Sequence, residues 1–318
     1  MNITKADNKV IDLHADTLTK CHAKGCSVAD NQTMQFALDR VPAGMRWCQC
    51  MAVFIPDELR GKAAADYFDD VYAFYRRELE QNCSTLAEVQ SLNGIDDALN
   101  GTPAAGILTV EGGAVLAGKL ENVEKLYRRG VRMMTLTWNG ANEIAGGAST
   151  DIGFTPFGRA VVGQMERLGM VVDVSHLSDR AFWELCEFAT RPFVASHSNA
   201  RTVCGVSRNL TDEMFGEIVR RGGLVGINYY THFIAPAGKG ATAEKLVEHI
   251  LHFLALGGED VLALGSDYDG ADLPPDMDRV EKLPRLFEAM RAAKIPEKVI
   301  AKIQYKNARR FFAAVKGV

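Results

Sequence analysis

Several features that identify common protein classes are missing from this sequence of 318 residues. No apolar run approaches the 18 or more residues of a membrane-spanning helix. Lysine and arginine total 36 against 40 acidic residues, whereas nucleic-acid-binding domains normally carry a basic excess. The first residues lack the apolar core of a signal peptide, and the last lack the hydrophobic tail that precedes a lipid anchor. We therefore expect a protein that binds neither nucleic acid nor membrane.

Cysteine is also scarce and shows no metal-binding or disulfide pattern. The chain has seven cysteines, an odd number, and no Cys-x-x-Cys pair. Cys48 and Cys50 lie two apart in an apolar run, so both should face one side of a strand as buried thiols. This usage predicts a reducing, cytoplasmic environment.

Two sequence motifs, one typical of dinucleotide binding and one of serine catalysis, are absent as well. No Gly-x-Gly-x-x-Gly follows the first apolar run, which disfavours a dinucleotide-binding fold. No Gly-x-Ser-x-Gly occurs, which disfavours a serine nucleophile of the α/β-hydrolase type.

What the sequence does contain is an alternation of short apolar runs and helical patterns. With 47% hydrophobic and 24% charged residues, the chain is typical of a globular protein. Thr155, Ser178 and Thr211 are N-cap residues of three predicted helices, and other helical patterns cover about 63–81, 242–256 and the chain from about 296. The predicted strands are residues 10–16, 47–55, 105–112, 131–138, 170–176, 193–198, 224–229 and 261–267.

Strands that are apolar on both faces and alternate with helices predict a parallel sheet. Eight such units in about 300 residues favour an α/β fold of the (β/α)8, or TIM-barrel, type. We expect one catalytic domain over residues 1–318, with a doubly wound sheet as the alternative.

Histidines and acids stand where the predicted strands end. His14 and Asp16 are two apart on the first strand, so both should point to one face. Glu111, His176 and His197 end three other strands, and active sites of such barrels gather at this rim. Alone, each is typical of a strand end or a hydrogen-bonded histidine, but together they predict a metal site. Three imidazoles and two carboxylates suit zinc, and five ligands exceed the three of a mononuclear site, so a carboxylate shared between two ions is expected.

The chain resembles the membrane (renal-type) dipeptidases, the zinc peptidase family M19 of the amidohydrolase superfamily. The resemblance runs from about residue 10 to 315 in consistent order. The matching segments are Ile11-Asp-Leu-His-Ala-Asp16, Glu111-Gly-Gly, Met134-Thr-Leu-Thr137, Thr155-Pro-Phe-Gly158, Val172-Asp-Val-Ser-His176, Ser196-His-Ser198, Ser207-Arg-Asn209 and Gly265-Ser-Asp-Tyr-Asp-Gly270.

The resemblance implies a role for each site residue. Glu111 corresponds to the carboxylate that bridges two Zn2+ or other divalent ions. His14 and Asp16 would complete one ion, and His176 and His197 the other. Arg208 matches the arginine that holds the free carboxylate of a dipeptide substrate, and Asp267 the acid beside the bridging water. Family members are commonly dimers, so the resemblance also implies a homodimer.

One position departs from the family pattern. The animal enzymes have a histidine after the Leu-Thr of the fourth strand, thought to contact substrate near the scissile carbonyl, and this chain has Trp138. Trp138 is either a packing residue of the rim or, since aromatic side chains line small-molecule pockets, a wall of the pocket.

The chemistry predicts a metal-dependent hydrolase, and the resemblance implies that it is a dipeptidase. Two divalent ions can hold a water between them and lower its pKa toward about 7, which produces a hydroxide nucleophile. Asp267 is not needed as a ligand, so it is free to orient the hydroxide and pass its proton to the leaving amine. The alternatives are a dizinc hydrolase of another small amide, lactam or lactone, and a catalytically silent barrel that binds metal.

Overall fold

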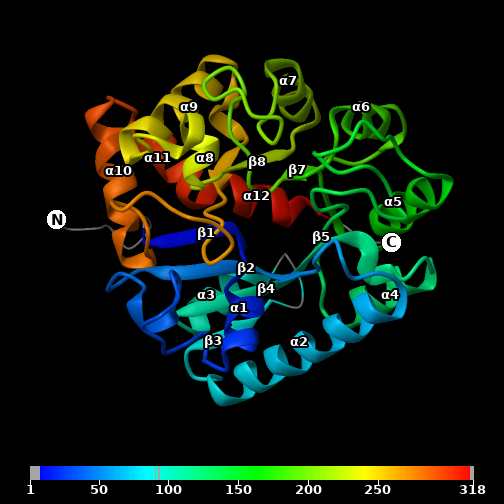
Figure 1. The fold of residues 1–318 in the computed structure, drawn as a ribbon. Helices are drawn as coiled ribbons and strands as arrows, with labels where there is room; N and C mark the ends of the chain where they lie inside the picture. Colours follow the sequence, from blue (N-terminus) through cyan, green and yellow to red (C-terminus); the bar gives the residue numbers. More distant parts are fainter. Residues whose placement is uncertain (1–7, 90, 92–93, 316–318) are drawn as a thin grey trace.

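The computed structural model describes residues 8–89, 91 and 94–315 (Figure 1). Its strands pair in parallel in the order β2-β1-β9-β8-β7-β6-β5-β4-β3, and an additional β2–β4 pairing closes eight of them into a ring. The strands are β1 (Lys9–Ala15), β2 (Arg46–Phe54), β3 (Leu86–Glu88), β4 (Ala104–Glu111), β5 (Met133–Thr135), β6 (Val171–Asp173), β7 (Val194–Ala195), β8 (Leu224–Ile227) and β9 (Leu262–Leu264).

The closed ring confirms the predicted (β/α)8 barrel, and each of the eight predicted strands is present. The short β3, which pairs only with β4 outside the ring, was not predicted, because three residues carry no readable alternation. Most observed strands end earlier than predicted: β5 stops at Thr135, so Trp138 lies on the loop beyond it.

Helices surround the ring of strands (Figure 1). The three predicted N-caps are confirmed, since the Thr155, Ser178 and Thr211 hydroxyls accept backbone N–H bonds of 2.9, 3.0 and 3.2 Å. No helix in the described ranges is long and apolar enough to cross a membrane. The helices are α1 (Thr17–Lys24), α2 (Gly61–Gln81), α3 (Ile95–Gly101), α4 (Glu121–Arg128), α5 (Pro156–Leu168), α6 (Asp179–Phe188), α7 (Asp212–Arg221), α8 (Thr231–Ile234), α9 (Ala243–Ala255), α10 (Leu283–Ala292), α11 (Glu297–Ala301) and α12 (Asn307–Ala314).

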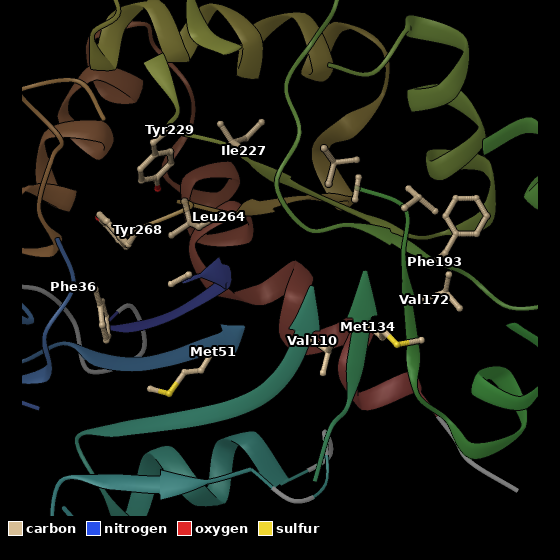
Figure 2. Close-up of a cluster of buried hydrophobic side chains, with 14 of the residues drawn as sticks. Phe36, Met51, Val110, Met134, Val172, Phe193, Ile227, Tyr229, Leu264 and Tyr268 are labelled. Atoms are coloured by element: carbon tan, nitrogen blue, oxygen red, sulfur yellow. The ribbon is translucent and has the colours of Figure 1, made fainter. Parts of the chain in front are cut away.

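Two apolar cores lie on the two sides of the strands. The outer core, part of which Figure 2 shows, joins strand residues such as Met134 and Leu264 to the surrounding helices. The inner core takes residues from all eight ring strands, including Cys48 and Cys50, and adds Phe312 of α12. The prediction of buried thiols is confirmed, and burial raises the pKa of both well above the usual value. Four inner-core residues, Met133, Val171, Val194 and Leu224, are the first residues of their strands, so α12 closes the N-terminal end of the barrel.

A bulge in β1 lies next to His14, near the C-terminal end of the barrel. Asp12 pairs with Gln49 and Ala15 with Met51, so β1 takes three steps where β2 takes two. Leu13 therefore belongs to the inner core and Ala15 to the outer core, although they are two residues apart. His14 and Asp16 do point to the same site, 3.8 Å apart, as predicted. They are not alternate residues of one regular strand, however, because of the bulge and because Asp16 lies beyond the strand.

Candidate metal centre and active site

The candidate site residues meet at the C-terminal ends of the strands. Glu111 is the last residue of β4, and His176, His197 and Asp267 follow β6, β7 and β9. Asp16 follows β1 and precedes α1, yet its carboxylate does not cap that helix. These side chains and His14 are nearly inaccessible to solvent. An aspartate at this position normally accepts a backbone N–H, so its free carboxylate is available to the site.

Glu111 stands between the histidines. Its Oε2 lies 3.6 Å from His14 Nε2, while its Oε1 lies 2.9 Å from His176 Nε2 and 3.4 Å from His197 Nε2. The two oxygens of one carboxylate therefore face different histidines. The Nε2 atoms of His176 and His197 are 2.9 Å apart, and the His14 and His197 rings stack at 3.9 Å.

Negative charge is concentrated around His14. Its Nε2 lies 3.8 Å from Asp16 Oδ2 and 3.9 Å from Asp267 Oδ1, in addition to Glu111. Neither His14 Nε2 nor Asp16 Oδ1, both buried, has a hydrogen-bond partner in the part of the chain that the structure describes. Within the described residues, no lysine or arginine forms an ion pair with any of these three carboxylates. Buried charges left unpaired are costly, so this arrangement calls for cations.

The pKa values of these groups reflect burial and crowding. Burial disfavours the charged form of His14, but the surrounding carboxylates, Glu111 first, outweigh it and raise its pKa to about 10. Burial raises the pKa of Glu111 well above its usual range. Burial also lowers the pKa of His176 and of His197 well below the ordinary value. Both rings are therefore neutral at pH 7, the form in which imidazole binds metals.

The donor set fits divalent metal ions. Two groups of ligand atoms lie within 4.8 Å of one another: His14, Glu111 and His197, and His14, Asp16 and Asp267. Imidazole nitrogen and carboxylate oxygen are the ligands that zinc prefers in catalytic sites. His176 Nε2, close to both Glu111 and His197, adds a further donor.

Asp267 is held in a strained position over the site. Its backbone has φ of +64°, a conformation that L-residues seldom adopt, and His176 shares this feature with φ of +69°. Asn228 Nδ2 donates to Asp267 Oδ2 at 3.0 Å. Burial raises the pKa of Asp267 to about 6, with Asp16 adding to the effect. A carboxyl with that pKa can accept and release a proton near neutral pH.

A cavity of about 540 Å3 opens onto the site. Glu111, His176, Asp267 and Trp138 are among the residues that line it. The Trp138 ring packs edge-on against Phe54 at 5.0 Å and lies 6.4 Å from the His176 ring. Trp138 is therefore a wall of this cavity as well as a packed residue of the rim.

Arg208 lies behind this cavity rather than on its wall. Its guanidinium is 5.3 Å from the ring of Phe233, which does line the cavity. The side chain is buried and donates long hydrogen bonds to Ser198 Oγ (3.3 Å) and the His197 carbonyl (3.2 Å), while its Nε has no partner among the described residues. Burial lowers the pKa of Arg208 to about 10. The group is a buried cation that is paired with no carboxylate of the described residues.

Sequence reasoning missed the residues that hold these side chains. Asn139 Oδ1 lies 3.0 Å from His176 Nδ1, and Ser196 Oγ lies 2.7 Å from His197 Nδ1. Two fully buried aspartates, Asp12 and Asp173, receive backbone and side-chain hydrogen bonds beside the ligands. The available signal was an acid in the middle of an apolar run of the sequence, where burial of an unpaired charge is costly.

The model of the membrane dipeptidase family (peptidase family M19) matches residues 2–318. An uncharacterized protein of Klebsiella pneumoniae from the pqqA 5′ region is 36% identical over 209 residues, 62% of this chain and 77% of that protein. An uncharacterized dipeptidase of Schizosaccharomyces pombe is 35% identical over 187 residues, 57% of this chain and 46% of that protein. The aligned region thus spans about half the length of the yeast relative.

Two solved structures share the fold. Dipeptidase AC, a metallopeptidase of family M19, superposes with a TM-score of 0.92 at 24% identity, covering 98% of this chain and 100% of that one. A second structure is a metallopeptidase from Rhodobacter sphaeroides liganded with a phosphinate mimic of the dipeptide L-Ala-D-Ala. It superposes with a TM-score of 0.90 at 23% identity, covering 97% of this chain and 99% of that one. The resemblance seen in the sequence is confirmed, and the predicted enzyme class, a dipeptidase, is that of the family. Because the family model matches almost the whole sequence, this chain belongs to the membrane dipeptidase family, peptidase family M19.

Proposed function

We propose that this chain is a metal-dependent dipeptidase that hydrolyses the peptide bond of small dipeptides with a free C-terminal carboxylate, using two zinc or other divalent ions. The observation that carries the proposal is the position of Glu111, whose two oxygens face different histidines in a buried site rich in carboxylates. One carboxylate placed between two sets of donors is typical of a ligand shared by two ions.

The residues divide into two sets around Glu111. We assign His14 and Asp16 to one ion and His176 and His197 to the other, with Glu111 belonging to both. When bound, such ions act as Lewis acids that polarise a carbonyl and make water more acidic at neutral pH.

Asp267 is the group we assign to proton transfer. Its carboxylate faces the site, since Oδ1 lies 3.9 Å from His14 Nε2, and Asn228 holds the other oxygen. With a pKa near 6, Asp267 can accept a proton from the attacking water and donate it to the leaving amine. Proton delivery to nitrogen is required, because an unprotonated amide nitrogen is a very poor leaving group.

Arg208 is the group we assign to the substrate carboxylate. A buried guanidinium with an unpartnered Nε has the charge and the donors to bind a carboxylate through two hydrogen bonds. Phe233 lines the cavity and contacts Arg208, so the substrate carboxylate would reach the guanidinium beside this ring. Trp138, on the cavity wall, would contact the substrate side chains.

The test combines metal analysis with a substrate screen. The purified protein is stripped with a chelator, reloaded with zinc, and assayed against dipeptides as free acids and as C-terminal amides. We expect two ions per chain, hydrolysis that depends on them, and a strong preference for the free acids. At most one tightly bound ion would overturn the two-ion site, and no hydrolysis of any dipeptide would overturn the assigned activity.

A further inference from the structure

A buried aspartate stands one hydrogen bond behind His197. Asp173, the last residue of β6, is fully buried and forms no ion pair with a lysine or arginine within the described ranges. Its Oδ1 accepts the backbone N–H groups of Ser175 (3.0 Å) and Ser196 (2.9 Å). Its Oδ2 accepts the hydroxyls of Thr135 (2.5 Å) and Ser196 (2.6 Å). All four partners are donors, as an ionised carboxylate requires.

This arrangement decides which way the next hydrogen bond runs. Ser196 has one hydroxyl proton, and the bond to Asp173 uses it. Its Oγ also lies 2.7 Å from His197 Nδ1, so in that contact it can only accept. The His197 proton must then sit on Nδ1. Nε2 is left bare, and it is this atom that faces Glu111 Oε1 and His176 Nε2.

We propose that Asp173 and Ser196 are positioning residues that fix the tautomer and orientation of His197, so that its bare Nε2 is presented to a metal ion. The inference rests on the proposed metal site. Hydrogen bonds of this type behind a histidine ligand hold the ring and increase its basicity, and removing them typically weakens metal binding about 10- to 100-fold.

Thr135 provides a matched control. Its hydroxyl donates to the same Asp173 oxygen as Ser196 does, but no hydrogen bond joins it to His197. Ser196→Ala and Thr135→Val each remove one buried hydroxyl from one carboxylate. Only Ser196→Ala should therefore change His197.

Asp173→Asn should reverse the chain of hydrogen bonds rather than remove it. The amide oxygen has to face the two backbone N–H groups, so the NH2 group takes the place of Oδ2. That group donates to Ser196 Oγ, which then donates its own proton to His197 Nδ1. The imidazole proton is forced onto Nε2, and the ring can no longer bind a metal there. An aspartate-to-asparagine change that reverses a histidine tautomer has this logic in serine proteases.

The measurements are zinc affinity, by competition with a chromophoric chelator, and the ring 15N chemical shifts of His197 in metal-free protein. The shifts separate protonated from bare ring nitrogens, and a His197→Gln sample assigns them. We expect Nδ1–H in wild type and Thr135→Val, Nε2–H in Asp173→Asn, and mixed tautomers in Ser196→Ala. Zinc affinity should fall about 10- to 100-fold in Ser196→Ala, at least as far in Asp173→Asn, and little in Thr135→Val.

Two results would overturn the inference. One is that His197 keeps its proton on Nδ1 in Asp173→Asn. The other is that Thr135→Val lowers zinc affinity as much as Ser196→Ala does. Thermal unfolding of the metal-free variants shows whether each is folded. If wild type binds no zinc, the proposed function fails, but the nitrogen shifts still decide the tautomer question.

Discussion

At its N-terminal end the barrel is filled and closed, whereas at its C-terminal end it is open and charged. Phe312 of α12 packs into the inner core at 1% exposure. Nearby, Asp96 takes hydrogen bonds from Lys9, Tyr305 and Arg309. At the other end, Glu111 is surrounded by acids and imidazoles around a 540 Å3 cavity, and no lysine or arginine of the described ranges is paired with it.

The difference shows that the N-terminal end of the barrel stabilises the fold and that the C-terminal end carries the candidate active site. Apolar contacts and satisfied charges at the closed end stabilise the barrel. Buried acids crowded around one histidine, and left-handed backbone at His176 and Asp267, should make the open end less stable when no cation is bound. Barrel enzymes generally divide these tasks between the two ends. Four predictions test this division, from the largest expected effect to the smallest.

Substituting one buried glutamate at each end should give opposite results. Glu111→Ala removes the carboxylate we assign to both ions, so metal content should fall from two ions per chain to almost none, with activity at background. Glu166 is also buried, but it accepts backbone N–H bonds from Thr190 and Arg191 at 2.8 and 2.9 Å. Glu166→Ala should lower Tm and keep both ions. Elemental analysis and thermal unfolding check the pair. Loss of a single ion from Glu111→Ala would argue against its bridging role.

Phenylalanines at the two ends should differ in their contribution to stability. Phe312→Ala leaves a cavity in the inner core and should lower the free energy of unfolding by about 3–5 kcal/mol, with no change in bound metal. Phe233 is half-buried on the cavity wall, so Phe233→Ala should lower the free energy of unfolding much less. Chemical denaturation of both metal-free variants measures this. Equal losses would remove the contrast between the ends.

Arginines at the two ends should differ in their effect on substrate choice. Truncating one partner of a buried charge pair costs about 2–5 kcal/mol, so Arg208→Met should lower kcat/KM for free dipeptides roughly 30- to 4,000-fold. It should barely affect the amidated dipeptides, and Arg208→Lys should recover part of the loss. Arg221→Met, near the closed end, removes bonds to the carbonyls of Cys186 and Ala189 and should leave the acid-to-amide ratio unchanged. If Arg208→Met lowers kcat/KM equally for the free-acid and the amidated dipeptides, Arg208 is not the residue that binds the substrate carboxylate.

Trp138 should affect only the choice among dipeptides. Trp138→His changes the shape of the cavity wall, so relative rates across a dipeptide panel should shift by roughly tenfold, with bound metal unchanged. Trp183, which is 42% exposed on α6, provides the control through Trp183→His. Identical relative rates across the dipeptide panel for wild type and Trp138→His would show that Trp138 only packs at the rim.

Much of the architecture could be read from the sequence. Each ring strand is an apolar run that the core requires on both faces, and the three hydroxyl caps mark helix starts because they satisfy local backbone groups. The three-residue β3 could not be read, and neither could the C-terminal ends of the strands. Whether a rim residue still pairs depends on the curvature of the neighbouring strand, as the early end of β5 shows.

The candidate ligands could be named from the sequence because each lies at or just beyond the end of an apolar run, and parallel strands in a closed barrel end at the same rim. How His14 reaches the site could not be foreseen. A bulge depends on the match between β1 and β2, which only strand pairing settles. The position of Arg208 against Phe233 is equally non-local, since it depends on how the loop after β7 packs against α8.

The sequence by itself determined the barrel, its helix starts and the set of nitrogen and oxygen donors, because these follow from local patterns of apolar and polar residues. The tertiary structure alone decided that the two Glu111 oxygens face different histidines. It also decided that Asp16 leaves its helix uncapped and that Asp173 lies one hydroxyl away from His197. These relations join residues far apart in the chain or set local backbone geometry against local preference. They exist only once eight strands have closed and fixed the distances between them.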